Sequence, residues 1–438
     1  MSNRDWLERS RAAVWHPCTQ MKRHERLPLV PLVRGQGVWL YDFDGGRYLD
    51  AVSSWWVNLF GHCNPAINAA LIDQLGRLEH AMLAGFTHAP VVELSERLAA
   101  RTGGRLGHAF YGSDGASATE IALKLSFHYW RNSGRPDKTG YVSLANGYHG
   151  ETIGALSVTD VALFRDTYAP LLRATARMPS PDARLAEPGE SAEAYALRCA
   201  AALDRYLAEH HETTAALIVE PLVQGAAGMA MYDPAYLRAA RESCDRHRVH
   251  LIADEIAVGF GRTGSFFACE QAGIWPDLMC LSKGLSGGYL PLSAVLATGE
   301  IYSAFYDDDL TRGFLHSHSY TGNPLACRAA VAMLDLFEAR DVLADNRALA
   351  EYVDALAEPI RALSHVRQFR RRGMIWAFDV AGAPVDFSQR LFAAALEREL
   401  LLRPLGATVY WMPPYVIGRD EAAHMVEATL GALRQVMR

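Results

Sequence analysis

Two short apolar segments, each followed at once by a chemically active side chain, constrain the fold of this chain most strongly. Residues 249–253 (VHLIA) end at Asp254-Glu255, and residues 278–281 (LMCL) end at Ser282-Lys283-Gly284. Continuous apolar runs of this length are typical of buried parallel strands. Ligands of an open α/β sheet bind beyond the carboxyl ends of its strands, so we expect the acid and the lysine to face one site.

A lysine and an acid in this arrangement suit pyridoxal 5'-phosphate. Burial between small residues disfavours the ammonium form of Lys283, lowers its pKa and makes the free amine a usable nucleophile. The cofactor forms a Schiff base with a lysine, and a carboxylate, here Asp254, keeps its ring nitrogen protonated. The alternative is that Asp254 and Glu255 cap a helix and that Lys283 reaches solvent.

The same stretch contains the glycine pattern of a dinucleotide-binding loop, Gly259-x-Gly261-x-x-Gly264. That pattern is meaningful only where a strand runs directly into it and a long helix follows. Here two acids precede the glycines, where they would repel a pyrophosphate, and residues 265–276 are too short and broken for a crossover helix. We therefore interpret the segment as a glycine-rich loop and not as a nicotinamide site.

Length and composition limit the class of protein. The 438 residues exceed one ordinary core and predict two domains, or one large domain with an extension. A net charge of −6 gives no electrostatic reason to expect nucleic acid or an anionic membrane as partner, and no apolar run approaches the roughly 20 residues that span a bilayer. The seven cysteines are scattered, and the first 18 residues lack the apolar core of a signal peptide. These features predict a cytoplasmic protein with reduced thiols and no zinc site.

Strands and helices alternate through the middle of the chain, which indicates a parallel sheet with right-handed crossovers. The strands are expected near residues 108–111, 140–144, 215–219, 249–253, 278–281 and 293–297. A smaller α+β domain is expected from the two ends of the chain, residues 1–60 with 336–438, and a large domain from residues 61–335. An N-terminal hairpin would join three C-terminal helices and three strands in the smaller domain.

Residues 113–130 begin with a glycine turn and continue as a long amphipathic helix, with Ser113 or Asp114 as N-cap. The free N–H groups and the dipole of such a terminus favour a phosphate, although many helices begin this way and bind nothing. Tyr148 follows the second strand at the ligand edge of the sheet. It could stack on an aromatic ring there, but packing within its own loop is the commoner outcome.

Other polar and aromatic residues have two interpretations each. In an extended chain, Trp55 and Trp56 point to opposite faces, so one could line a cleft while the other is buried; otherwise both lie in the core. Arg403 lies in an apolar context, and a buried arginine needs an anion, either an internal carboxylate or that of a substrate. His316 and His318 lack a nearby third ligand for a metal.

These segments together resemble the class III aminotransferases of the fold type I pyridoxal-phosphate family. The resemblance covers nearly the whole chain and is carried by WHPCT (15–19), SSWW (53–56), NGYHGET (146–152), VEPLVQGA (219–226), LIADEIAVGFGRTG (251–264), LSKGLSGG (281–288), TGNPLAC (321–327) and RPLGATVYWMPPY (403–415). It implies an α/β fold with a mostly parallel central sheet in the large domain and a smaller α+β domain built from both termini. It also implies a homodimer with its active site at the interface.

The resemblance further implies roles for single residues. Lys283 would be the Schiff-base lysine, Asp254 the partner of the ring nitrogen, and Arg403 the partner of a keto-acid carboxylate. The implied cofactor-binding residues are Gly115, Ala116, Tyr148, Asp254, Lys283, His318 and Ser319, the last from the partner subunit. The implied substrate-binding residues are Cys18, Trp55, Tyr148, Lys283, Ser317, Arg403 and Tyr410.

Within the class, the WHP, SSWW and YWMPPY segments are similar to those of enzymes of biotin biosynthesis. The implied reaction transfers an amine from S-adenosylmethionine to 7-keto-8-aminopelargonate, which gives 7,8-diaminopelargonate. An ω-amino acid or lysine as donor is the alternative, and a decarboxylase or a non-catalytic cofactor-binding protein is a more distant one. The chain departs from the family pattern at Ala116 (usually serine), at Ser317-His318-Ser319 (usually Gly-Pro-Thr) and at Cys18 (usually tyrosine).

Overall fold

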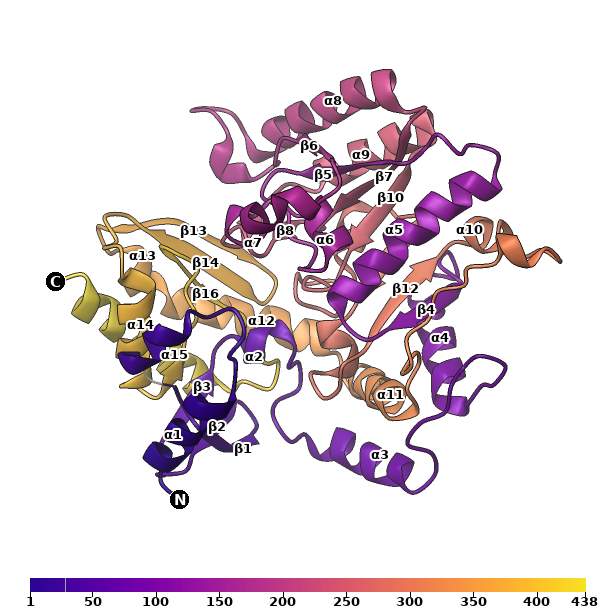
Figure 1. Ribbon diagram of the computed structural model, residues 1–438. Coiled ribbons are helices and arrows are strands. Elements are labelled where there is room, and N and C mark those ends of the chain that lie inside the picture. Colours follow the sequence, from indigo (N-terminus) through magenta and orange to yellow (C-terminus); the bar gives the residue numbers. More distant parts are fainter. Residues whose placement is uncertain (28) are drawn as a thin grey trace. The chain divides into compact units, whose positions relative to one another are not determined.

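The computed structural model describes residues 1–27 and 29–438 and divides into two units (Figure 1). The smaller unit contains residues 1–68 and 344–438, and the larger contains residues 69–343. Both bounds lie further along the chain than the expected residues 60 and 335. Among the described residues, no helix is both long enough and apolar enough to cross a membrane.

A seven-stranded sheet forms the centre of the larger unit, in the order β4-β12-β11-β10-β7-β5-β6. The strands are β4 (His108–Gly112), β5 (Gly140–Leu144), β6 (Ala176–Met178), β7 (Thr214–Val219), β10 (His250–Asp254), β11 (Leu278–Leu281) and β12 (Ser293–Ala297). All six expected strands are present, and the three-residue β6 was not predicted. Strand β12 is antiparallel to both neighbours, so a purely parallel sheet would be wrong here. The reason is the short connection between β11 and β12, because a parallel crossover needs a dozen or more residues and usually a helix.

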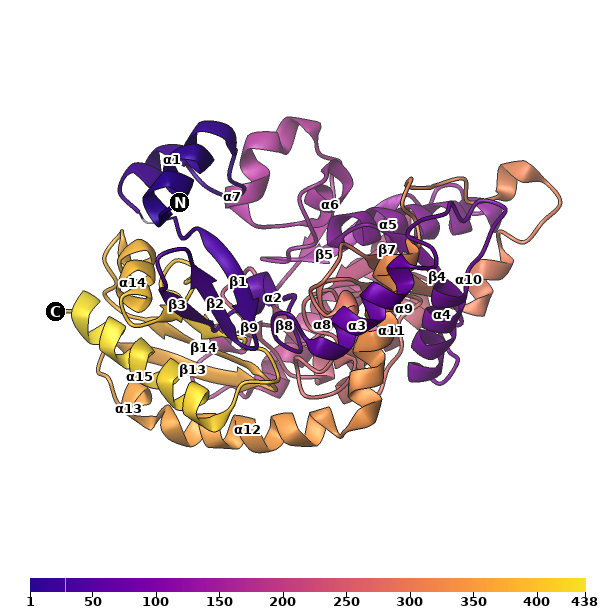
Figure 2. The ribbon, with the colours of Figure 1, turned by 90° about the horizontal axis from the view of Figure 1, so that it is seen from below.

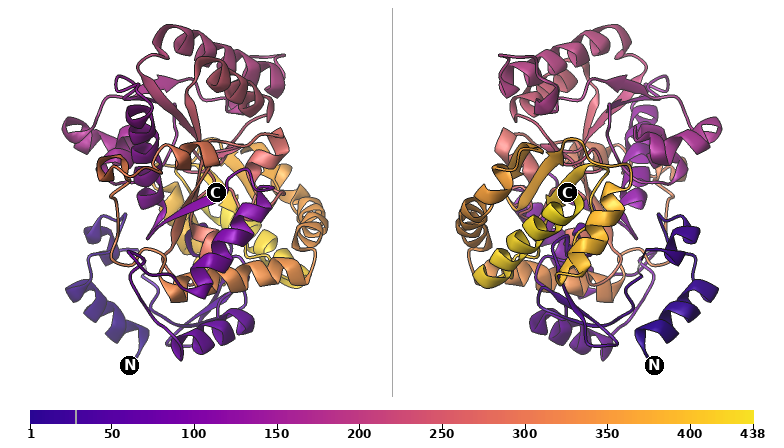
Figure 3. Two further views of the ribbon diagram at one scale, coloured as in Figure 1. Left: turned by 90° about the vertical axis from the view of Figure 1, so that its right-hand side faces the viewer. Right: turned by 90° about the vertical axis from the view of Figure 1, so that its left-hand side faces the viewer.

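Helices cover both faces of this sheet. Helix α5 (Gly115–Asn132) connects β4 to β5 in one direction along the sheet, while α8 (Ala192–His210) and α9 (Ala235–His247) lead back through β7 to β10. Right-handed crossovers that run in opposite directions place their helices on opposite faces. Helices α8 and α9 lie side by side (Figure 3).

The core of the larger unit follows from its apolar runs. Every residue of β7, β10, β11 and β12 is buried. Helix α5 turns Ala118, Ile121 and Ala122 onto the sheet with no exposed area. Burying a large aliphatic side chain contributes about 1.5–3 kcal/mol, so these strands fix the positions of the loops at their ends.

The remaining helices and strands of the larger unit are shorter or peripheral. They are α4 (Ala89–Arg101), α6 (Ile153–Val158), α7 (Ala162–Arg165), β8 (Val223–Gln224), β9 (Ala230–Met231), α10 (Gly299–Ser303) and α11 (Pro324–Ala339). Helices α3 (Pro65–Leu75) and α12 (Val342–Leu356) run across the two unit bounds.

The smaller unit is α+β and draws on both ends of the chain. One sheet has the order β1-β2-β3-β15, and its β15 from the C-terminal part pairs in parallel with β3 of the N-terminal hairpin. The second sheet has the order β13-β14-β16, with α15 crossing in front of β13 and β14 in the view from below (Figure 2). The elements are α1 (Asn3–Ala13), β1 (Leu32–Gln36), β2 (Trp39–Asp42), β3 (Arg47–Asp50), α2 (Ser53–Trp56), α13 (Glu358–Arg361), β13 (Val366–Arg372), β14 (Ile375–Val380), α14 (Phe387–Leu396), β15 (Leu400–Leu401), β16 (Thr408–Trp411) and α15 (Arg419–Val436).

The tryptophan pair corrects one expectation. Residues 53–56 are not extended, because all four have positive φ angles between 46° and 75°. Trp56 is nevertheless buried, at 6% exposed, and Trp55 is open, at 43%. A tight left-handed turn therefore separates the two rings. The expectation from the sequence was that the alternating side chains of an extended strand would separate them.

Candidate active site

Lys283 and Asp254 lie at the same edge of the central sheet. Asp254 is the last residue of β10 and pairs in register with Cys280 of β11, and Lys283 follows that strand after one serine. The backbone of Lys283 has a φ of 45°, in the left-handed region. A non-glycine residue there costs roughly 1–2 kcal/mol, and such strain is found mostly where the surrounding structure fixes a functional side chain.

The environment of Lys283 favours its neutral amine. Burial lowers the pKa of this lysine, while the carboxylates of Asp254 and Glu220 act in the opposite direction. Desolvation is the larger effect, so the amine is less basic than that of an exposed lysine. This is the state that a lysine needs in order to attack an aldehyde.

Asp254 is buried and held by two donors. The Nδ1 atom of His149 lies 2.7 Å from its Oδ2 atom, and the backbone N–H of Ile256 donates to Oδ1 at 3.1 Å. His149 is itself only 2% exposed, and among the described residues its buried Nε2 atom has no hydrogen-bond partner. Asp254 therefore has a fixed orientation at the strand end.

Glu255 does not share this site. Its carboxylate accepts hydrogen bonds from the backbone N–H groups of Ala268 and Cys269, at 2.9 and 2.8 Å, and burial raises its pKa to about 7. These bonds fix the loop that follows the three glycines. Of the two acids, Asp254 is thus the one that acts on Lys283, and the glycine pattern lies in a loop, as the sequence predicted.

Glu220 is a further site residue that sequence reasoning missed. It follows β7, is buried, and accepts hydrogen bonds from the N–H groups of Tyr148 and Gly225, both at 2.9 Å. Burial raises its pKa to about 7; neighbouring Asp254 also raises that pKa, while His149 lowers it. The sequence did contain a signal for Glu220, because this acid follows a buried strand in the same way that Asp254 ends one. It also contained a signal for His149, which is adjacent to the predicted site residue Tyr148.

The start of α5 offers free backbone donors. Asp114 is the N-cap, and its side chain accepts from the N–H of Ser117 at 2.9 Å. Among the described residues, the N–H groups of Gly115 and Ala116 have no acceptor, so they are available to an anion. Gly150 packs against this turn so closely that a Cβ atom there would lie 2.6 Å from that of Ala116.

The loop residues near α5 are placed as follows. Tyr148 is partly buried, its hydroxyl donates to Glu151 at 2.9 Å, and its ring lies 5.5 Å from that of Phe164. The Nδ1 atom of His318 lies 3.3 Å from the hydroxyl of Ser113, beside the helix start. Ser317 and Ser319 are exposed.

The smaller unit holds the other predicted substrate residues. The guanidinium of Arg403 lies over the ring of Trp55, 4.3 Å from its centroid. The residue is exposed and has no carboxylate partner among the described residues, so the expectation of a buried arginine is wrong. It lies in the loop between β15 and β16, and its apolar neighbours Leu400 and Leu402 are the buried ones. Tyr410 is buried, with its hydroxyl 3.1 Å from the indole nitrogen of Trp56, and burial raises its pKa to about 12. Cys18 is exposed, with a φ of 51°.

The residues of the larger unit fit pyridoxal phosphate in three respects. Lys283 supplies an amine of lowered pKa, Asp254 supplies a buried and oriented carboxylate, and the start of α5 supplies two unused N–H donors. These three features correspond to the aldehyde, the ring nitrogen and the phosphate of the cofactor.

Comparison with known proteins agrees with this geometry. The Aminotransferase class-III family model matches residues 20–433. The chain is 45% identical to the adenosylmethionine-8-amino-7-oxononanoate aminotransferase of Helicobacter pylori, over 97% of each chain. It is 41% identical to that of Geobacter sulfurreducens, over 97% of this chain and 95% of the relative.

Solved structures show the same likeness in three dimensions. The adenosylmethionine-8-amino-7-oxononanoate aminotransferase of Methanocaldococcus jannaschii superposes with a TM-score of 0.93 at 33% identity and covers 99% of both chains. An amine transaminase from an uncultivated Pseudomonas species, in its pyridoxal-phosphate-bound form, gives 0.91 at 32% identity and covers 97% of this chain and 99% of that one. The expected fold class, cofactor and type of enzyme are confirmed, and the chain belongs to the class-III aminotransferase family, as a pyridoxal-phosphate-dependent aminotransferase.

Proposed function

We propose that this aminotransferase transfers the amine of S-adenosylmethionine to 7-keto-8-aminopelargonate and so forms 7,8-diaminopelargonate in biotin biosynthesis. The observation that carries the proposal is the 45% identity, over 97% of each chain, to a relative named for these two substrates. The pairing of Lys283 with Asp254 is what any such transamination requires.

Two side chains and one helix terminus serve the cofactor in this proposal. When bound, pyridoxal phosphate supplies the carbonyl carbon and the electron-withdrawing ring through which an amine is transferred. The Nζ atom of Lys283 would hold the cofactor. Once the donor amine has displaced it, Nζ would take the proton from the donor carbon and give it to the carbon that carried the cofactor's carbonyl group. Asp254, oriented by His149, keeps the ring nitrogen protonated, and the N–H groups of Gly115 and Ala116 bind the phosphate.

Arg403 and Trp55 are the substrate groups of this proposal that lie in the smaller unit. The guanidinium of Arg403 can bind the keto-acid carboxylate with two parallel hydrogen bonds, because no protein carboxylate in the described chain occupies it. Trp55 is 43% exposed, and its ring already has the guanidinium of Arg403 over it. Since cations bind to the faces of indole rings, the same ring suits the sulfonium of S-adenosylmethionine. Cys18, Tyr148, Ser317 and Tyr410 complete the proposed substrate set.

We also propose a homodimer in which Ser319 of the partner contributes to phosphate binding. Large apolar side chains are exposed near that serine and on the loop before α4: Met82, Phe86, Leu310, Leu315 and Tyr320. Exposed apolar groups of this kind favour contact with a protein partner over contact with solvent. Sedimentation at micromolar concentration should give twice the mass of one chain.

The free state of all seven cysteines is consistent with a place in the cytoplasm.

The decisive experiment supplies purified enzyme and 7-keto-8-aminopelargonate with one donor at a time. S-adenosylmethionine should give 7,8-diaminopelargonate, whereas lysine and an ω-amino acid should give little. An ω-amino acid donor is the second candidate, because an engineered ω-transaminase superposes with a TM-score of 0.94 at 27% identity. Product with either of these donors but not with S-adenosylmethionine would refute the proposed donor.

A further inference from the structure

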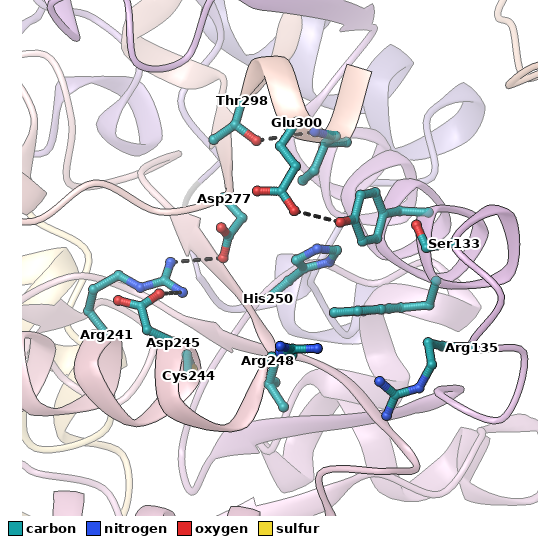
Figure 4. Close-up of a pocket in the computed structure, with 14 residues that line it drawn as sticks. Ser133, Arg135, Arg241, Cys244, Asp245, Arg248, His250, Asp277, Thr298 and Glu300 are labelled. Atoms are coloured by element: carbon teal, nitrogen blue, oxygen red, sulfur yellow. Dashed lines mark hydrogen bonds and ion pairs between the residues drawn. The ribbon is translucent and has the colours of Figure 1, made fainter. Parts of the chain in front are cut away.

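A polar cavity lies in the larger unit at the edge of the sheet opposite Lys283 (Figure 4). Its volume is about 570 Å³, and its lining includes His250, where β10 begins. Asp254 is at the other end of the same strand, roughly 13 Å away for four residue steps. The proposed transamination uses none of the residues that line this cavity.

Most charges in the lining neutralise one another. Arg241 donates to Asp277 at 2.8 Å and pairs with Asp245 at 2.7 Å. Asp277 also accepts from the N–H of Leu251 at 2.6 Å. Arg135 pairs with Glu212, which lies outside the lining. Two further charged side chains of the lining, Arg248 and Glu300, take part in none of these ion pairs.

Arg248 has a fixed backbone and an unoccupied head group. It ends α9 in the left-handed conformation, with φ of 51° and ψ of 54°, at a position where glycine is the usual residue. The ammonium of Lys138 donates to its carbonyl at 2.8 Å and so holds that turn. Among the described residues, its guanidinium has no hydrogen-bond or ion-pair partner.

Glu300 faces the cavity from another element. It lies in the first turn of α10, and its Oε1 atom accepts from the hydroxyl of Tyr129 at 2.7 Å. In the described chain, its Oε2 atom accepts no hydrogen bond. Figure 4 shows Glu300 and Asp277 toward one end of the lining and Arg248 and Arg135 toward the other.

His250 lies between these two ends and adds no charge. Its ring stacks on Trp130 at 4.6 Å, and its Nδ1 atom lies 2.9 Å from the hydroxyl of Ser126. Burial keeps the imidazole neutral at physiological pH, since it lowers the pKa to about 4. The two charged side chains of the lining without an ion-pair partner in the described chain thus lie toward opposite ends, Glu300 and Arg248, with the neutral His250 between them.

We propose that this cavity binds a small zwitterion of the amino-acid type, with its carboxylate at Arg248 and its ammonium at Glu300. A guanidinium binds a carboxylate through two charge-assisted hydrogen bonds. Both side chains are exposed and therefore solvated. A ligand that carries both charges can contact both of them at once, whereas a simple anion or cation can contact only one. The inference does not depend on which amine donor the enzyme uses.

Titration calorimetry on the purified holoenzyme tests the proposal, with N-methylglycine and proline as probes. Their secondary ammonium groups cannot be transferred by transamination, so heat from turnover is avoided. Both should bind saturably, with a Kd of about 1 mM or tighter. Acetate and dimethylammonium, which carry one charge each, should bind at least about tenfold more weakly.

Two substitutions locate the site. Arg248→Gln and Glu300→Gln should each weaken N-methylglycine binding by about tenfold or more, and glutamine at 300 retains the acceptor for Tyr129. Arg198→Gln, which removes an exposed arginine of α8 outside the cavity, should change nothing. Unchanged melting temperatures will show that the variants are folded. Absence of saturable binding, binding that neither cavity variant weakens, or equal affinity for acetate would overturn the proposal.

Discussion

Acidification should destabilise the larger unit through His250. The imidazole is 7% exposed, and burial lowers its pKa from 6.5 to about 4. An unfolded chain takes up a proton below about pH 6.5 while the folded chain does not, so the stabilising effect of the neutral ring is complete above that pH and is lost as the pH falls to 4. The pKa difference of about 2.5 corresponds to roughly 3 kcal/mol at pH 4, of which about 2 kcal/mol is lost by pH 5.

The measurement is urea-induced unfolding at pH 7 and pH 5, followed by circular dichroism, for the natural protein and for His250→Gln. Glutamine keeps a polar group near Ser126 but cannot titrate, so its loss of unfolding free energy between the two pH values should be smaller by about 2 kcal/mol. His210→Gln, at an exposed position of α8, is the matched control and should behave like the natural protein. Equal losses in all three proteins, or a titration midpoint of His250 near 6.5 by NMR, would refute the reasoning.

Four predictions concern the proposed active site. Borohydride should fix the cofactor on Lys283, as mass spectrometry can show, and Lys283→Ala should lose turnover by roughly 10²–10⁴-fold; an adduct on another lysine would contradict the assignment. Asp254→Asn should still bind the cofactor, by its absorbance, yet lose most of its activity, because an amide cannot stabilise a charged ring nitrogen; near-normal half-reaction rates would exclude the role. Arg403→Lys should slow the keto-acid half-reaction by roughly 10–100-fold and the donor half-reaction far less, because lysine cannot form the bidentate pair; equal losses would indicate a structural role. A small thiol reagent should inactivate the enzyme at Cys18, with protection by 7-keto-8-aminopelargonate, and Cys18→Ala should stay active and resist the reagent; inactivation without protection would place this residue outside the substrate site.

The strands of the larger unit could be predicted because burial on both faces leaves a continuous apolar run. Residues 250–254 and 278–281 have this pattern, and both are completely buried strands. The apolar run of β12 does not give the direction of the strand, since its composition is the same whether the strand is parallel or antiparallel. The signal for the direction was the short connection from β11. The left-handed turn at residues 53–56 was missed for a related reason: Ser-Ser-Trp-Trp contains no glycine to signal positive φ.

The candidate site was predicted in its chemistry but not in its supporting contacts. Lys283 and Asp254 stand at the ends of adjacent runs, so local sequence was sufficient for them. The contact between His149 and Asp254 joins residues 105 positions apart, from the ends of β5 and β10, which are separated in the sheet by β7. These two side chains come together only because of the order of the strands in the sheet. That order cannot be read from any single segment of the sequence.

The choice between Asp254 and Glu255 shows what the structure adds. Asp254 ends β10 and Glu255 follows it. Burial acts with opposite sign on an acid and on a base, so it raises the pKa of Glu220 and Glu255 to about 7 and lowers that of Lys283. The carboxylate oxygens of Glu255 accept hydrogen bonds from two backbone N–H groups of a loop. Asp254 instead accepts from His149 at 2.7 Å, beside the lysine. Burial therefore disfavours the charged forms of Lys283 and of Glu220. Asp254, fixed beside the lysine by His149 and by the N–H of Ile256, is therefore the carboxyl group placed to partner the ring nitrogen in the proposed reaction.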